Sequence, residues 1–224
     1  MRVLMCVLVL CACGTPPGRL TLTASGVSDF STADGYAVHF TKASMLVSEF
    51  ALATTTDQQG PKTGGELSVD LLAPQPNIVR IFDNVPAQRW DAVSWSLGND
   101  GGVSLELEGT IVKDNTNKTF AWSFNTDTMY SHCGQSITIP SNGKTSAELT
   151  VRAERLWNDS IVDAGTLQGA AIFDADTDDA IITLEELGVA PSYDGTGTLR
   201  DFVTAQVRTI GGFQNELSCT VTAR

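Results

Sequence analysis

The alternation of apolar and polar residues constrains this chain more than any other feature of its sequence. Across residues 20–151, short runs with a period of two follow one another, each bounded by Gly, Pro, Asn or Asp. Because the side chains of a strand point alternately to its two faces, this pattern predicts half-buried strands. Asp34-Gly35 and Asn142-Gly143 favour hairpin turns. The predicted strands lie within residues 20–27, 36–52, 65–72, 77–82, 91–98, 103–112, 119–125, 135–139 and 146–151.

The pattern changes after Leu156, where helical spacing replaces alternation. Residues 166–173 (TLQGAAIF) predict a short helix, and residues 182–187 predict the start of another. Residues 198–210 place their apolar side chains along one stripe and open with a capping box, and a Gly-Gly pair follows them. The run GFQNELSCTV (212–221) then predicts the last strand.

These patterns together predict one mainly β domain, an antiparallel β-sandwich over residues 20–224. Residues 163–212 are expected to form a small helical, EF-hand-like insertion before the last strand. With 224 residues, of which 42% are hydrophobic, the chain is long enough to bury a core of this size.

The first residues indicate export and a lipid anchor. A positive charge at Arg2 precedes the apolar residues 3–12, too few for a bilayer, which needs about 20. The end of this run, Leu-Cys-Ala-Cys-Gly, resembles the lipobox of bacterial lipoproteins. The resemblance implies that residues 1–12 are a signal peptide, that Cys13 is acylated, and that residues 13–19 form a lipidated tether.

Partners and location follow from the same features. A lipid on Cys13 places the protein in the cell envelope, facing the periplasm or the cell surface. Gly14 after it slightly favours the outer membrane. The formal net charge of −12 argues against a nucleic acid partner, because an acidic chain repels phosphate. The expected partners are the membrane, through the lipid, and an envelope protein or glycan.

Two cysteines remain after the leader, Cys133 and Cys219. In an oxidising compartment two cysteines most simply pair, so we expect a disulfide between them. Closing a loop of this length stabilises a fold by about 4–5 kcal/mol in the chain-entropy model. Two buried thiols are the alternative.

The acidic stretch DADTDDAIITLEEL (174–187) resembles the calcium loop of an EF-hand. In its twelve-residue frame, carboxylates stand at positions 1, 3, 5 and 12, and position 7 offers a backbone carbonyl. The sequence therefore predicts one structural Ca²⁺ site. Its expected ligands are Asp174, Asp176, Asp178, the carbonyl of Ala180, and Glu185.

Two residues depart from that frame. Asp179 stands at position 6, where the frame has a glycine with positive φ, and Ile182 at position 9 offers no side-chain oxygen. EF-hands usually pair, and the sequence shows no second loop. We therefore expect weak binding, with a Kd on the order of 10⁻⁴–10⁻³ M. The alternative is an acidic, solvated loop that holds no ion.

Several segments resemble a group of bacterial, often myxobacterial, lipoproteins related to the MbnP-like family of copper proteins. The resemblance implies a secreted β-sandwich and, in the copper branch, a role in holding metal. Histidines of that family correspond to Arg152, Arg155 and a position near Gly212, where this chain has none. The resembling segments are residues 33–52, 69–98, 119–133, 147–160, the acidic loop and 211–219.

A periplasmic copper-handling protein is therefore the second functional interpretation. The soft donors available to it are His39, His132, Met45 and Met129, and no spacing brings them together. His39 is most simply a surface strand residue, and His132 a neighbour of the disulfide.

An enzyme that acts on glycans is a distant third interpretation. The chain lacks the common nucleophile, zinc and phosphate-loop motifs. Glu106 and Glu108 share one strand face and offer paired carboxylates, although such pairs are usually just a polar outer face. Trp90, Trp95, Trp122 and Trp157 are expected in the core rather than on a sugar-binding platform. The favoured function is a non-catalytic binding module with one structural calcium loop.

Overall fold

The computed structural model describes residues 15–56, 58–98, 102–161 and 165–224. The predicted signal peptide, residues 1–12, and the predicted lipidation site, Cys13, lie outside these residues. Residues 163 and 164, at the start of the predicted helical segment, also lie outside them. Among the described residues, none of the helices has the length and apolar character that crossing a membrane requires.

The smaller of two main sheets has four strands in the order β15-β13-β1-β6. These are β1 (Gly18–Ala24), β6 (Asn77–Val85), β13 (Lys144–Val151) and β15 (Gly211–Phe213). β1 runs antiparallel to β6 but parallel to β13, so the antiparallel prediction fails at this pair. A parallel pair requires a long connection rather than a hairpin, and more than a hundred residues separate β1 from β13.

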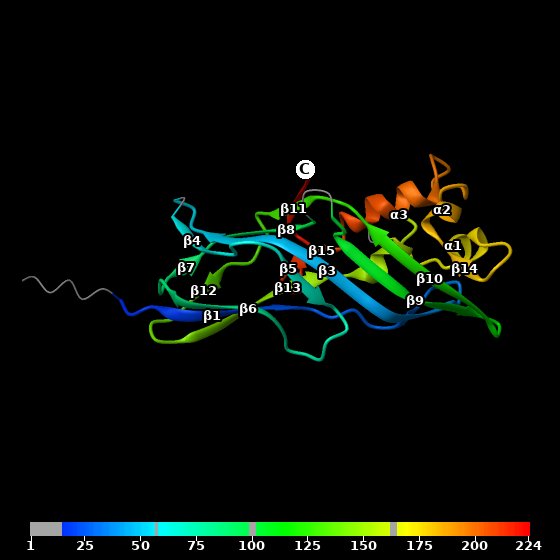
Figure 1. Ribbon diagram of the computed structural model, residues 1–224. Helices are drawn as coiled ribbons and strands as arrows, with labels where there is room; N and C mark the ends of the chain where they lie inside the picture. Colours follow the sequence, from blue (N-terminus) through cyan, green and yellow to red (C-terminus); the bar gives the residue numbers. More distant parts are fainter. Residues whose placement is uncertain (1–14, 57, 99–101, 162–164) are drawn as a thin grey trace, which may run out of the picture.

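The larger sheet has ten strands and is organised around β3 (Ala37–Ala53). The first half of β3 pairs with β9 (Leu105–Lys113), and the second half pairs with β8 (Ala92–Leu97). The two sheets form the layers seen in Figure 1, which confirms the mainly β sandwich. A separate two-stranded sheet pairs β7 (Arg89–Trp90) with β12 (Ile137–Thr138). The other strands of the large sheet are β2 (Phe30–Ser31), β4 (Gln59–Lys62), β5 (Leu67–Asp70), β10 (Thr116–Phe124), β11 (Thr128–Ser131), β14 (Ile181–Ile182) and β16 (Thr220–Ala223).

The C-terminal run differs from the predicted single strand. It forms β15 in the small sheet and β16 in the large sheet, so the chain crosses between the layers after Phe213. Cys219 lies directly before β16 and forms the predicted disulfide with Cys133, which follows β11 closely. β11 and β16 also pair, so the covalent link and the hydrogen-bonded ladder hold the same two segments.

The core contains all four tryptophans, each no more than 1% exposed. Trp122 and Trp157 pack with Phe40 and Phe120 in one aromatic cluster. The prediction that the tryptophans belong to the core is confirmed, and none of them is available as a platform for sugars.

The helices gather at one end of the sandwich, beside β10 and β14 (Figure 1). They comprise a 3₁₀ turn, η1 (Ala153–Trp157), followed by α1 (Ala170–Ala175), α2 (Leu184–Leu187) and α3 (Leu199–Val207). The predicted capping box of α3 is present between Thr198 and Asp201. The helical insertion before the last strand is thus confirmed as an element of the fold.

Candidate metal site

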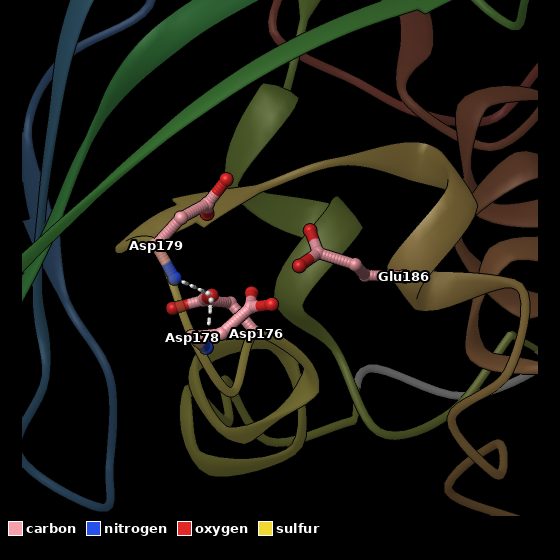
Figure 2. A group of neighbouring side chains, drawn as sticks. All are labelled: Asp176, Asp178, Asp179 and Glu186. Atoms are coloured by element: carbon pink, nitrogen blue, oxygen red, sulfur yellow. Dashed lines mark hydrogen bonds between the residues drawn. The ribbon is translucent and has the colours of Figure 1, made fainter.

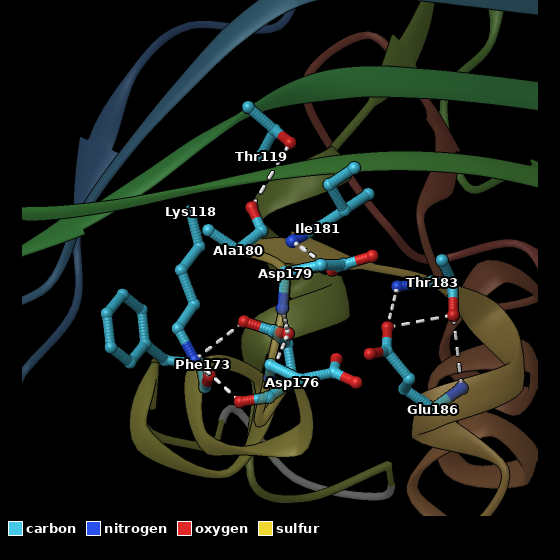
Figure 3. Close-up of polar contacts among 10 residues, drawn as sticks. Lys118, Thr119, Phe173, Asp176, Asp179, Ala180, Ile181, Thr183 and Glu186 are labelled. Atoms are coloured by element: carbon cyan, nitrogen blue, oxygen red, sulfur yellow. Dashed lines mark hydrogen bonds and ion pairs between the residues drawn. The ribbon is translucent and has the colours of Figure 1, made fainter.

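The acidic loop is attached to the edge of the large sheet through β14. This two-residue strand pairs in parallel with β10. The backbone N–H of Thr119 donates to the carbonyl of Ala180 at 2.9 Å, and the Thr119 hydroxyl donates to the same carbonyl (Figure 3). The buried indole N–H of Trp122 donates to the carbonyl of Ile182 at 3.0 Å. The edge of the sandwich therefore holds the end of the acidic loop through backbone and side-chain hydrogen bonds.

A distant carboxylate fixes the start of the helix that enters the loop. The N-cap residue of α1 is Gly169, which has no side chain to cap the helix. Asp34, from the turn between β2 and β3, accepts hydrogen bonds from the backbone N–H groups of Gly169 and Ala170 at 2.9–3.0 Å. Burial raises the pKa of Asp34, but these bonds and one from the Thr32 hydroxyl outweigh it and hold the pKa below its usual value.

Four carboxylates converge inside the loop. Asp176, Asp178, Asp179 and Glu186 each offer one oxygen, and these four atoms lie within 4.8 Å of one another (Figure 2). Two oxygens bound to one Ca²⁺ at 2.3–2.6 Å can lie no more than about 5 Å apart. The spacing is therefore compatible with a shared ion.

This group differs from the ligand set expected from the twelve-residue frame. Asp176 and Asp178 belong to it, whereas Asp174 and Glu185 are exposed and lie outside it. The Ala180 carbonyl, expected at position 7, accepts from Thr119 in the sheet. Asp179, expected only to weaken the site, contributes an oxygen to it.

The difference arises because the second half of the loop is shifted by one residue. Thr183 caps α2, donating its backbone N–H to Glu186 at 2.6 Å and accepting from the Glu186 N–H (Figure 3). Ile182 is fully buried and Ile181 is exposed, so Ile182 takes the packing role of position 8. Ala180, and not Asp179, has the positive φ of position 6.

Counted back from Glu186 at position 12, Thr183, Ile182 and Ala180 occupy positions 9, 8 and 6. The segment from Asp174 to Glu186 is therefore one residue longer than the twelve-residue frame. A signal for this shift is present in the sequence. Thr-Leu-Glu-Glu (183–186) is a capping box, which places the helix start at Thr183 and Glu186 three residues later.

A lysine of the sandwich already contacts one of these carboxylates. The Lys118 ammonium, from β10, lies 2.9 Å from Asp176 Oδ2 and donates to the backbone carbonyls of Phe173 and Asp176 (Figure 3). Asp176 Oδ1 accepts from the N–H groups of Asp178 and Asp179. The Lys118 ammonium, helped by these backbone bonds, holds the pKa of Asp176 below its usual value.

The residues of the alternative interpretations lie elsewhere. His39 contacts the Asp29 carboxylate at 2.8 Å, and the ring of His132 lies beside the Ser131 hydroxyl. Within the part of the chain that the structure describes, the acidic group is the only set of three or more His, Cys, Asp or Glu side chains close enough to share an ion.

The paired glutamates of β9 lie on the surface with a common counter-ion. The Lys42 ammonium lies 3.2 Å from a carboxylate oxygen of Glu106 and 3.2 Å from one of Glu108. All three side chains are about one third to one half exposed. The contacts are those of a solvated ion network on one sheet face.

Comparisons with known proteins add one distant structural likeness. No protein-family model matches the chain, and no curated protein matches it. Among solved structures, MbnP from Methylosinus trichosporium matches with a TM-score of 0.37 and 10% sequence identity, covering 92% of this chain and 96% of that one. At this TM-score the likeness carries no argument about the site or the function.

Proposed function

We propose that the chain is a non-catalytic binding module of the cell envelope whose acidic loop takes up one Ca²⁺. The observation that supports the calcium site is the convergence of Asp176, Asp178, Asp179 and Glu186 within 4.8 Å. The envelope location rests on the leader and on Cys13. The ion would fix the helical segment against the sandwich, so its role is structural.

The chemistry of the donors favours calcium over softer metals. All four offer hard carboxylate oxygens, which suit Ca²⁺ and Mg²⁺, whereas copper prefers imidazole and sulfur. Mg²⁺ requires near-ideal octahedral geometry, and Ca²⁺ tolerates the irregular arrangement of an exposed loop. Four carboxylates against the one ammonium of Lys118 leave an excess of negative charge that a divalent cation relieves.

Lys118 also sets the strength of the site. Its ammonium holds one oxygen of Asp176, so an incoming ion must share or displace that contact. We therefore expect a Kd on the order of 10⁻⁴–10⁻³ M, the range of extracellular calcium modules.

Calorimetric titration of the purified protein with CaCl₂, MgCl₂ and CuSO₄, alongside thermal melts, tests the proposal. The expected result is one Ca²⁺ per chain, a melting temperature that rises with calcium, and weaker binding of Mg²⁺. No heat and no thermal shift at several millimolar calcium would refute the calcium site. Tight stoichiometric copper uptake would instead favour the copper-handling alternative.

A further inference from the structure

A second concave site lies next to the 3₁₀ turn η1, and none of the acidic-loop carboxylates lines it. The cavity has a volume of about 300 Å³. Its walls are formed chiefly by Arg152, Glu154, Arg155, Asn158, Leu167 and Leu217. Two residues with guanidinium groups, one with a carboxylate, one with a carboxamide and two leucines thus line one space, and the two arginines leave it a net positive charge.

Arg155 carries a polar group that needs a partner. Its Nε is buried and has no hydrogen-bond partner among the residues that the structure describes. A guanidinium N–H that is removed from water without an acceptor is unfavourable, and such groups in folded proteins usually have a partner. The enclosed Nε–H is out of reach of a solute, but Arg155 as a whole is partly exposed and lines the cavity, so its guanidinium is left without a partner inside the described chain.

Arg152 adds a second positive charge that is only loosely held. Its nearest carboxylate oxygen, on Glu154, lies 3.6 Å away, which is longer than a hydrogen bond, and both side chains remain at least one third exposed. An exposed pair of this kind contributes little stability. The Arg152 guanidinium is therefore free to turn toward a stronger acceptor.

The rest of the cavity is built before any ligand arrives. Asn158 is 4% exposed, and its backbone carbonyl accepts from the buried side-chain amide of Gln206 in α3. Asn158 also forms an antiparallel bridge with Leu167, and the Gln168 N–H donates to the Trp157 carbonyl at 2.7 Å. The segment that contains Leu167 is thus hydrogen-bonded to the segment that follows Arg155.

We propose that this cavity binds a small organic carboxylate with a short aliphatic group. The planar fork of Arg155 matches the two oxygens of a carboxylate, and Arg152 adds charge. Leu167 and Leu217 provide an apolar wall for the aliphatic part, which an inorganic anion lacks. The cavity is at the small end of the size range of small-molecule sites, about 300–1,000 Å³. The proposal does not depend on the calcium loop.

The test is an NMR titration that follows the arginine Nε–H resonances of the ¹⁵N-labelled protein. Butyrate is the probe, butyramide is the matched neutral molecule, and inorganic phosphate is the anion without an aliphatic part. We expect butyrate to shift the Arg155 resonance saturably, and butyramide and phosphate to bind at least about tenfold more weakly.

Variants separate the site from general charge effects. Arg155→Lys keeps the charge but loses the fork, and is expected to weaken butyrate binding at least about tenfold. Arg80→Lys, on the exposed surface of β6, is the matched control and should leave binding unchanged. Should Arg155→Lys not fold, Arg152→Lys replaces it with the same expectation. The proposal is overturned by an absence of saturable butyrate binding, by equal binding of butyramide or phosphate, or by an undiminished affinity in the folded variant.

Discussion

At the scale of single residues, the acidic loop carries a cation of its own in Lys118. Its ammonium contacts the Asp176 carboxylate and two backbone carbonyls, and lies 4.5 Å from the centre of the Phe173 ring. Only 14% of the Lys118 side chain and 2% of the Asp176 side chain are exposed. This contact holds the loop in shape, and in the proposed calcium site it would compete with the ion for Asp176.

Lys118→Met should therefore change stability and calcium affinity in opposite directions. Without the ammonium, the metal-free protein should melt a few degrees lower, because the carboxylates of the loop repel one another without relief. Calcium should bind at least about tenfold more tightly, because nothing competes for Asp176. Thermal melts in EDTA and calorimetric titration measure the two effects.

The matched control for this change is Lys144→Met, which removes an exposed ammonium at the start of β13. It should alter neither the melting temperature in EDTA nor the calcium affinity by a comparable amount. If Lys118→Met lowers calcium affinity, the lysine assists the ion, and the competition described here is wrong.

Asp34 gives a prediction with a defined pH dependence. Asp34→Ala removes the cap of α1 and should lower the free energy of unfolding by about 1 kcal/mol at neutral pH. The pKa of Asp34 is lowered in the folded state from an ordinary value of 3.8, so its contribution is fully present above that value. The contribution should disappear as the pH falls through the lowered folded pKa.

Urea unfolding of the wild type and of Asp34→Ala between pH 7 and pH 2.5 measures this contribution as a difference. Other carboxylates titrate in both proteins and cancel. A difference that stays constant down to the lowest pH would show that the Asp34 charge plays no part in the cap.

At the scale of elements, the alternation in the sequence predicts most strands because each has one buried and one solvated face. The long run at residues 36–52 forms β3, and the capping box at Thr198 marks the start of α3. The strands β2, β4, β7, β11 and β14 and the turn η1 were missed. Each of these strands spans four residues or fewer, which is too short for a period of two to stand out, and the 3₁₀ turn η1 carries no capping side chain.

The acidic group also differs from the predicted ligand frame for a related reason. Counted forward from Asp174 as position 1, the twelve-residue frame ends at Glu185. The structure begins α2 after Thr183, which places Glu186, one residue later, beside the aspartates. The attachment of β14 to β10 also has no local signal, because the two strands are far apart in sequence and meet only through the tertiary fold. Of the side chains predicted as ligands, the structure brings Asp176 and Asp178 into the acidic group and leaves Asp174 and Glu185 outside it.

Trp122→Phe tests how β14 is attached. The change keeps a buried aromatic ring but removes the N–H that donates to the Ile182 carbonyl. We expect a loss of about 1–2 kcal/mol in the free energy of unfolding and a smaller thermal shift on adding calcium. Chemical unfolding with and without calcium measures both.

Trp90→Phe is the matched control for this experiment. Trp90 is also fully buried, but its indole N–H has no hydrogen-bond partner among the described residues. It should lose packing without losing a hydrogen bond and should leave the calcium response unchanged. Equal effects on the calcium response would show that the Trp122 hydrogen bond does not position the loop.

At the scale of the whole molecule, the disulfide joins segments separated by 86 residues in sequence. The loop that it closes contains β13, the whole helical segment and β15. The double variant Cys133→Ser, Cys219→Ser should therefore lower the free energy of unfolding by up to about 4–5 kcal/mol. Urea unfolding measures the loss, and a loss below about 1 kcal/mol would show that the packing of β11 against β16 suffices without the bond.

Contacts with the rest of the molecule keep the acidic loop in shape. β10, Trp122 and Lys118 belong to the sandwich, and each contacts the loop directly. Asp34 holds the helix that enters it. The β-sandwich thereby holds the loop, and the start of α2 brings Glu186 rather than Glu185 into the acidic group of the proposed calcium site.

Calorimetric calcium titration of Glu186→Gln beside Glu185→Gln tests this ligand set most directly. Glutamine at 186 can keep the hydrogen bonds of the capping box but removes the charge, and the neighbouring change removes the same charge one residue away. We predict that Glu186→Gln weakens calcium binding at least about tenfold and that Glu185→Gln leaves it nearly unchanged. The reverse order would restore the unshifted frame and contradict the site described here.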